Sequence, residues 1–79
     1  MIFLIQYDRS LGQVVSLKAF SDSDKRAAED SRLDLEIRLS RDEVGHEVVL
    51  LEAESEEALR RTHRRYFENL TELASPSPR

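Results

Sequence analysis

The segment Ala58–Phe67 (ALRRTHRRYF) concentrates the side chains of this 79-residue chain that could bind an anion. Ten positions hold four arginines, one histidine and two aromatic residues. Guanidinium groups bind phosphate through charge-assisted hydrogen bonds, and aromatic rings can stack on bases. On a helix, at 100° per residue, the four arginines span an arc of about 140°. The pattern predicts a partner-binding surface, with candidate residues Arg60, Arg61, Arg64, Arg65, His63 and Tyr66.

Acidic residues stand one helical turn from most of these arginines. Three opposite-charge pairs are spaced i,i+4: Glu56 with Arg60, Glu57 with Arg61, and Arg64 with Glu68. Such pairs stabilise an exposed helix without any external partner. The whole chain carries a net charge of −4, and an acidic chain generally repels phosphate backbones. We therefore favour an internally paired helix face and keep nucleic acid as the alternative partner.

The other residue types give little basis for catalysis or metal binding. The chain has no cysteine, which excludes disulfides, thiolate catalysis and cysteine-ligated metals. The two histidines, His46 and His63, do not have the spacing of a metal motif, and no glycine-rich loop could hold a phosphate. The trio Tyr7-Asp8-Arg9 is typical of a turn. We expect no catalytic residue, no cofactor and no metal site, and interpret His63 as a half-buried packing residue.

Three segments have the composition of β-strands. Residues 2–7 (IFLIQY) and 14–20 (VVSLKAF) are rich in β-branched and aromatic residues and are joined by a short loop, which predicts an antiparallel hairpin. Residues 46–53 (HEVVLLEA) contain four consecutive apolar residues, which is typical of a strand covered on both faces. Because the first strand is apolar on both sides, we expect it at the centre, in the strand order 2-1-3.

Residues 22–44 fit a long helix better than a strand. Ser21 is a suitable N-cap and Gly45 a suitable C′ residue, and no glycine or proline interrupts the segment between them. The stretch RLDLEIRL, residues 32–39, nevertheless alternates strictly between polar and apolar residues. A strand over residues 32–41 therefore stays open as the alternative.

A last helix is predicted to begin after Ser55, which can cap it, and to run to about Leu73. The ending SPSPR cannot continue a helix. We therefore expect one small domain over residues 1–74 and a disordered tail over residues 75–79. The element order β-β-α-β-α predicts an α+β fold, in which a three-stranded sheet carries both helices on one face.

Two apolar surfaces of this arrangement predict self-association. A helix over residues 22–44 carries two apolar stripes on nearly opposite sides: Leu33 with Ile37, and Leu35 with Leu39. The sheet face opposite the two helices would expose Ile2, Leu4, Val48 and Leu50. Contiguous apolar faces normally mark an interaction site, so we expect both helix stripes to be covered and the chain to form a homodimer.

Composition sets the class of protein. No segment resembles a signal peptide or a membrane span, so we expect a cytoplasmic protein with no membrane partner. Arginine outnumbers lysine ten to two, which is typical of a GC-rich bacterial genome. These observations favour a small non-catalytic α+β module that homodimerises and binds an unidentified protein. The alternative is a nucleic-acid-binding accessory protein that uses the arginine face of the last helix.

Overall fold

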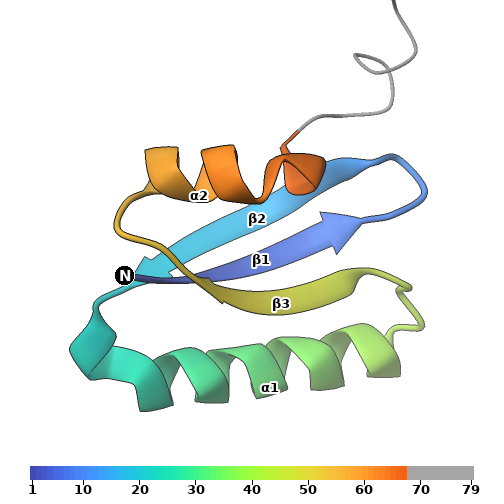
Figure 1. The fold of residues 1–79 in the computed structure, drawn as a ribbon. Helices are drawn as coiled ribbons and strands as arrows, with labels where there is room; N and C mark the ends of the chain where they lie inside the picture. Colours follow the sequence, from blue (N-terminus) through green and yellow to red (C-terminus); the bar gives the residue numbers. More distant parts are fainter. Residues whose placement is uncertain (68–79) are drawn as a thin grey trace, which may run out of the picture.

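The computed structural model describes residues 1–67, which form three strands and two α-helices (Figure 1). The elements follow in the order β1 (Ile2–Asp8), β2 (Gln13–Phe20), α1 (Lys25–Arg41), β3 (Glu47–Glu52) and α2 (Glu56–Thr62). A 3-10 turn over Asp22–Asp24 leads into α1, and another over Arg64–Tyr66 follows α2. The predicted order β-β-α-β-α is confirmed. The predicted domain end at residue 74 and the tail over residues 75–79 lie outside the described residues.

β1 lies between β2 and β3 and pairs antiparallel with both, which confirms the predicted strand order. All four residues of Ile2–Ile5 are apolar and buried, as a central strand requires. The register with β2 is regular as far as Gln6, opposite Ser16, and a bulge then shifts the pairing. Gly12 closes the hairpin with a φ of 68°, a left-handed conformation that glycine adopts without strain.

The sheet lies between the two helices, with α1 on one face and α2 on the other (Figure 1). Alternate side chains of β1 point to opposite faces. One set, Phe3, Ile5 and Tyr7, faces α2. These residues form the main core cluster together with Leu59 and Tyr66. The other set, Ile2 and Leu4, is equally buried, at 3% and 6% exposed. The prediction that both helices pack on one sheet face is therefore wrong.

The physical reason is that β1 is apolar on both sides and needs cover on both. α1 connects the parallel strands β2 and β3 across one face of the sheet, where Leu4 of β1 and Leu35 of α1 line the same cavity. After β3 the chain turns over the other face, where α2 packs. The four residues expected on a bare sheet face are buried or half-buried: Ile2, Leu4, Val48 and Leu50. A bare sheet face therefore gives no reason for dimerisation.

α1 confirms the helical prediction for the middle segment and excludes the alternative strand over residues 32–41. The helix ends at Arg41 rather than at residue 44. Glu43 has a φ of 55° and takes the left-handed position that was expected for Gly45.

One of the two apolar stripes of α1 is covered by the described chain. On the covered side, Ala28 is 0% and Leu35 is 9% exposed. On the other side, Leu33 and Ile37 are 56% and 55% exposed. We call Leu33 and Ile37 the outward stripe. The expectation that both faces of the helix are covered is therefore wrong for the single chain over residues 1–67.

Candidate functional site

The arginine-rich segment begins in α2 and continues in the 3-10 turn that follows it. Ser55 caps α2 as predicted, because the Ala58 N–H donates to its Oγ at 3.1 Å. α2 ends at Thr62, and His63 leaves the helical conformation with φ −123° and ψ 53°. The prediction of one continuous helix to about Leu73 is therefore wrong at His63. The four arginines consequently do not share one helical arc.

Arg60 and Arg61 have the partners that their spacing predicts. Arg60 Nη2 lies 2.8 Å from Glu56 Oε2, and Arg61 Nη1 lies 3.9 Å from Glu57 Oε1. The Arg60 guanidinium also lies over the Phe67 ring, 4.5 Å from its centroid. All four charged side chains are at least half exposed. Each pair therefore contributes at most about 0.5 kcal/mol and mainly orders the surface.

Arg65 and Tyr66 form a cluster with Glu47, the first residue of β3. Tyr66 Oη donates to Glu47 Oε2 at 2.7 Å, and Arg65 Nη2 donates to the two carboxylate oxygens at 2.9 and 3.1 Å. The Arg65 guanidinium lies 4.3 Å from the centroid of the Tyr66 ring. Tyr66 is 8% exposed and meets Tyr7 edge to face, with ring centroids 5.1 Å apart. The Tyr66 ring therefore belongs to the core and is not free to stack on a base.

This cluster holds Glu47 in its charged form. The Tyr66 hydroxyl and, after it, the Arg65 guanidinium lower the pKa of Glu47. Burial and the hydrogen bond to Glu47 raise the pKa of Tyr66, so its hydroxyl keeps the proton that it donates. A carboxylate with a lowered pKa stabilises the fold above its unfolded-state pKa. That contribution is lost as the pH falls through its folded-state pKa.

Replacing Tyr66 with Phe is expected to lower the free energy of unfolding by about 1 kcal/mol at pH 7. The difference from the wild type should shrink as the pH falls through the lowered pKa of Glu47, because the carboxylate then becomes protonated. Tyr7→Phe is the control, because the Tyr7 hydroxyl donates only a long bond, of 3.4 Å, to the Arg65 carbonyl. Urea unfolding at a series of pH values measures the free energy of unfolding of the wild type, Tyr66→Phe and Tyr7→Phe. A difference for Tyr66→Phe that stays constant to pH 2 would exclude a contribution from charged Glu47.

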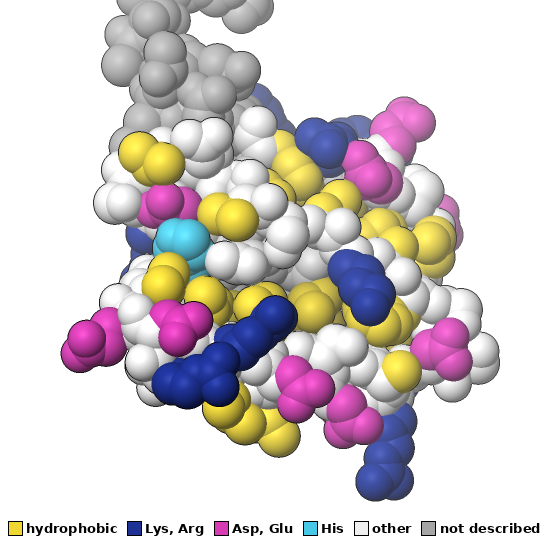
Figure 2. Space-filling model, turned by 180° about the vertical axis from the view of Figure 1, so that it is seen from behind, with side chains coloured by type: hydrophobic (Ala, Val, Ile, Leu, Met, Phe, Trp, Pro, Cys, Tyr) yellow, Lys and Arg dark blue, Asp and Glu magenta, His cyan; other side chains and the backbone are white. Residues whose placement is uncertain are grey.

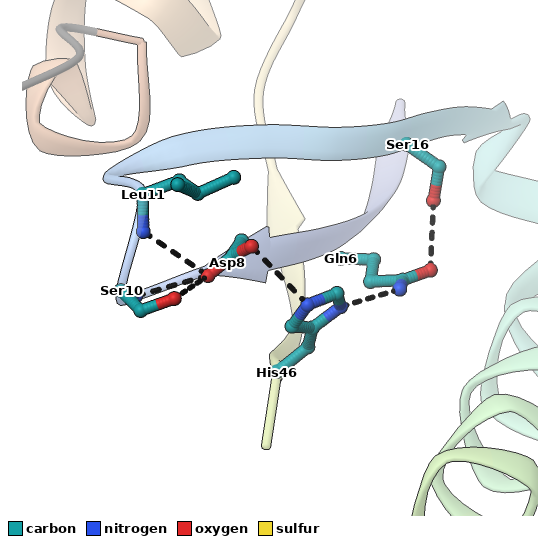
Figure 3. A network of polar contacts seen from close by, with 6 residues as sticks. All are labelled: Gln6, Asp8, Ser10, Leu11, Ser16 and His46. Atoms are coloured by element: carbon teal, nitrogen blue, oxygen red, sulfur yellow. Dashed lines mark hydrogen bonds and ion pairs between the residues drawn. The ribbon is translucent and has the colours of Figure 1, made fainter. Parts of the chain in front are cut away.

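At the same end of β1, on the other sheet face, Gln6, Asp8 and His46 connect β1 to the start of β3 (Figure 3). Gln6 Nε2 lies 2.8 Å from His46 Nδ1 and donates to it, because an amide nitrogen cannot accept. The ring proton is therefore on Nε2, 3.4 Å from Asp8 Oδ2. Asp8 Oδ1 accepts from Ser10 Oγ at 2.7 Å and from the N–H groups of Ser10 and Leu11. The hairpin turn is thus tied to β3.

The geometry of this network indicates a structural role, in which it holds the hairpin turn against the start of β3. Both ring nitrogens of His46 are engaged, and Ser16 Oγ donates to Gln6 Oε1 at 3.4 Å rather than to the ring. The Ser10 hydroxyl is the main cause of a lowered pKa at Asp8. Across residues 1–67, no group of three or more His, Cys, Asp or Glu side chains could hold a metal ion.

The sequence pointed to Asp8, His46, Arg65 and Tyr66 separately, and it gave no sign that Gln6 or Glu47 would join them. β1 and β3 pair antiparallel with Tyr7 opposite Glu47. This register places Glu47 on the face of Tyr66, and it brings the next residues, Asp8 and His46, to the same end of the sheet. Knowledge of this strand register would therefore have predicted both the Glu47 cluster and the network around His46.

The six candidate residues do not form one surface. Their places are as follows: Arg65 and Tyr66 join Glu47, Arg60 and Arg61 pair within α2, Arg64 begins the 3-10 turn, and His63 is a half-buried helix cap. The pair predicted between Arg64 and Glu68 lies outside the described residues, because Glu68 is not one of them. Within residues 1–67, no helix has the length and apolarity to cross a bilayer. No family model matches the chain, and no curated protein or solved structure shows significant similarity to it.

Proposed function

We propose that this protein is a non-catalytic interaction module that homodimerises through the outward stripe of α1. The observation that carries the proposal is the exposure of Leu33 and Ile37, 56% and 55%, on the uncovered side of the helix. Residues spaced i,i+4 are neighbours on a helix surface, so the two side chains form one patch. An exposed apolar patch rimmed by charged residues is typical of a protein–protein contact.

The charges beside the stripe favour an antiparallel pair of α1 helices. With the two-fold axis at the middle of the stripe, Leu33 of one protomer lies opposite Ile37 of the other. The same symmetry brings Glu29 opposite Arg41 at both ends of the contact. Glu29 is exposed, and Arg41 lies 3.6 Å from Asp42 in a pair whose side chains are 70% and 60% exposed. Such a surface pair is weak and can be exchanged for one with the second protomer.

The arginine-rich segment supports a structural role more than a nucleic-acid surface. Arg60, Arg61 and Arg65 each have a carboxylate partner, and Tyr66 is buried. On the face shown in Figure 2, Lys and Arg side chains are interspersed with Asp and Glu and do not gather into one basic patch. Nucleic-acid binding relies on clustered positive charge that displaces counterions. The pairing of these arginines and the mixed charges in Figure 2 therefore favour a protein partner over a nucleic acid.

Sedimentation equilibrium at protein concentrations from about 1 to 500 µM tests the proposal. We expect a mass that rises with concentration toward twice the 9.2 kDa chain mass. The stripe is small, so we expect a micromolar dissociation constant, which corresponds to about −8 kcal/mol. The mass of one chain at every concentration would contradict the proposal.

Labelled single- and double-stranded oligonucleotides give the second readout. We expect no saturable binding to either, even at low salt. Binding that weakens steeply as salt is added would instead favour the nucleic-acid alternative.

A further inference from the structure

The outer edge of β2 is a second open surface of the fold. β2 is an end strand of the sheet, and no strand among residues 1–67 pairs with its outer edge. About half of the backbone N–H and C=O groups of an end strand point away from its neighbour. The ladder with β1 is uninterrupted over residues 16–20, beyond the bulge. This part of β2 is therefore a regular template for another strand.

Two cavities flank β2, one on each face of the sheet. The cavity on the α2 side has a volume of about 290 Å³ and is lined in part by Val14, Leu17 and Arg60. The cavity on the α1 side has a volume of about 330 Å³ and is lined in part by Ser16, Lys18, Asp34 and Arg38. Side chains of a strand alternate between the two faces. An extended segment beside β2 would therefore direct its side chains toward the two cavities in turn.

The charges at these cavities favour an acidic segment. Lys18 and Arg38 are exposed, and neither forms an ion pair with any residue of the described chain. Lys18 Nζ instead lies 5.1 Å from the centroid of the Phe20 ring. The cavity on the α1 side keeps a net positive charge, because its two cations outnumber Asp34.

A second copy of β2 would not complement this charge. β2 has the sequence QVVSLKAF, which contains one lysine and no acidic residue. Two such strands would place positive charge near positive charge, and like charges across a strand pair are unfavourable. Glutamate or aspartate side chains would pair with Lys18 and Arg38 instead.

We infer that β2 binds an extended acidic segment of a partner protein by strand addition. The backbone of the partner pairs with the outer edge of β2, which supplies affinity independent of sequence. Its acidic side chains turn toward Lys18 and Arg38, and its apolar side chains turn toward Val14 and Leu17. The site does not depend on the proposed dimer, because β2 is separate from the outward stripe of α1.

An eight-residue peptide that alternates glutamate and valine is the probe. We expect its fluorescently labelled form to bind the full-length protein saturably at low salt, as measured by anisotropy. A peptide with lysine in place of glutamate should bind at least tenfold more weakly, because its charge is repelled. A glutamate–valine peptide with two central prolines should lose affinity to the same extent, because proline cannot donate to a strand ladder. Equal binding of the three peptides, or no binding of the first, would overturn the inference.

Lys18→Glu combined with Arg38→Glu should weaken binding of the acidic peptide at least tenfold. Arg9→Glu combined with Lys25→Glu is the control, because it changes the net charge equally at exposed residues outside both cavities. Circular dichroism and thermal unfolding establish that both variants fold. If the charge reversal at Lys18 and Arg38 prevents folding, Lys18→Gln with Arg38→Gln takes its place. Equal losses in the test variant and the control would mean that net charge alone attracts the peptide, and would overturn the inference.

Amide hydrogen exchange separates strand addition from adsorption to the surface. We expect exchange at alternate residues of the 16–20 segment to slow at least tenfold when the glutamate–valine peptide is bound, because the outward N–H groups become donors. Protection located on α1 or along Arg60–Tyr66 instead would overturn the inference. Self-association gives a further test. If the protein still self-associates with aspartate at both Leu33 and Ile37, but no longer does so in the Lys18 and Arg38 variant, then β2 binds a second copy of the chain and the inference is overturned.

Discussion

Replacing Leu33 and Ile37 together with aspartate is expected to raise the dissociation constant of the dimer about a thousandfold. Both side chains are a little more than half exposed in the single chain. Covering the exposed part stabilises the dimer by about 1 kcal/mol per side chain. Four such side chains meet across the two-fold axis and contribute about 4 kcal/mol, where 1.4 kcal/mol is a factor of ten. Repulsion among four carboxylates adds to this loss.

Sedimentation equilibrium of this double variant should give close to the mass of one chain up to about 50 µM, a concentration at which the wild type is mostly dimeric. Leu11→Asp with Val15→Asp is the control, because these apolar residues are 58% and 50% exposed and lie at the hairpin rather than on α1. The control adds the same charge and should dimerise like the wild type. Equal dissociation of both variants would exclude the outward stripe as the interface.

Replacing Leu59 with Ala is expected to lower the free energy of unfolding by about 3–4 kcal/mol. Leu59 is 0% exposed and packs in the core cluster with Phe3 and Ile5 of β1. The substitution removes buried apolar surface and leaves a cavity between α2 and the sheet. α2 has seven residues, too few for a stable isolated helix, so its position depends on this contact. A small domain has a total stability of about 5–10 kcal/mol, so the variant should lose a large share of it.

Urea unfolding at one fixed protein concentration measures this loss, because dimerisation makes the apparent stability depend on concentration. Leu11→Ala is the matched control: Leu11 is 58% exposed, and its truncation should cost less than about 0.5 kcal/mol. A cost below about 1 kcal/mol for Leu59→Ala would mean that α2 is not held against the sheet through this side chain.

The types of the elements could be predicted because local patterns decide them. The apolar run Ile2–Ile5 placed β1 at the centre of the sheet, where the structure has it. The alternation over residues 32–39 favoured a strand, but a segment without glycine or proline and with good helix formers is a helix in the structure. The two apolar sides of β1 already indicated that both sheet faces need cover. Which helix covers which face could not be predicted in this way, because it depends on the path of the whole chain.

The end of α2 and the contacts of the candidate site depend on residues far apart in the sequence. No glycine or proline lies between Ser55 and residue 67, and nothing local marks a stop at Thr62. The break after α2 accompanies the contact of Arg65 and Tyr66 with Glu47. The sequence around Arg65 and Tyr66 does not predict their contact with Glu47, because that contact depends on the strand register. The intrahelical pairs of α2, by contrast, follow from spacing alone and were predicted.

Cross-linking of single-cysteine variants tests the α1 dimer most directly, because the chain contains no cysteine of its own. In the antiparallel pair, a thiol at position 33 faces a thiol at position 37 of the other protomer. Two thiols at position 33 are offset by about 6 Å along the helix axes, at 1.5 Å per residue. We predict that a mixture of Leu33→Cys and Ile37→Cys chains forms a mixed disulfide under mild oxidation faster than either variant alone forms its own. Equal rates in the three samples, or no cross-link at about 500 µM protein, would contradict a dimer through the outward stripe.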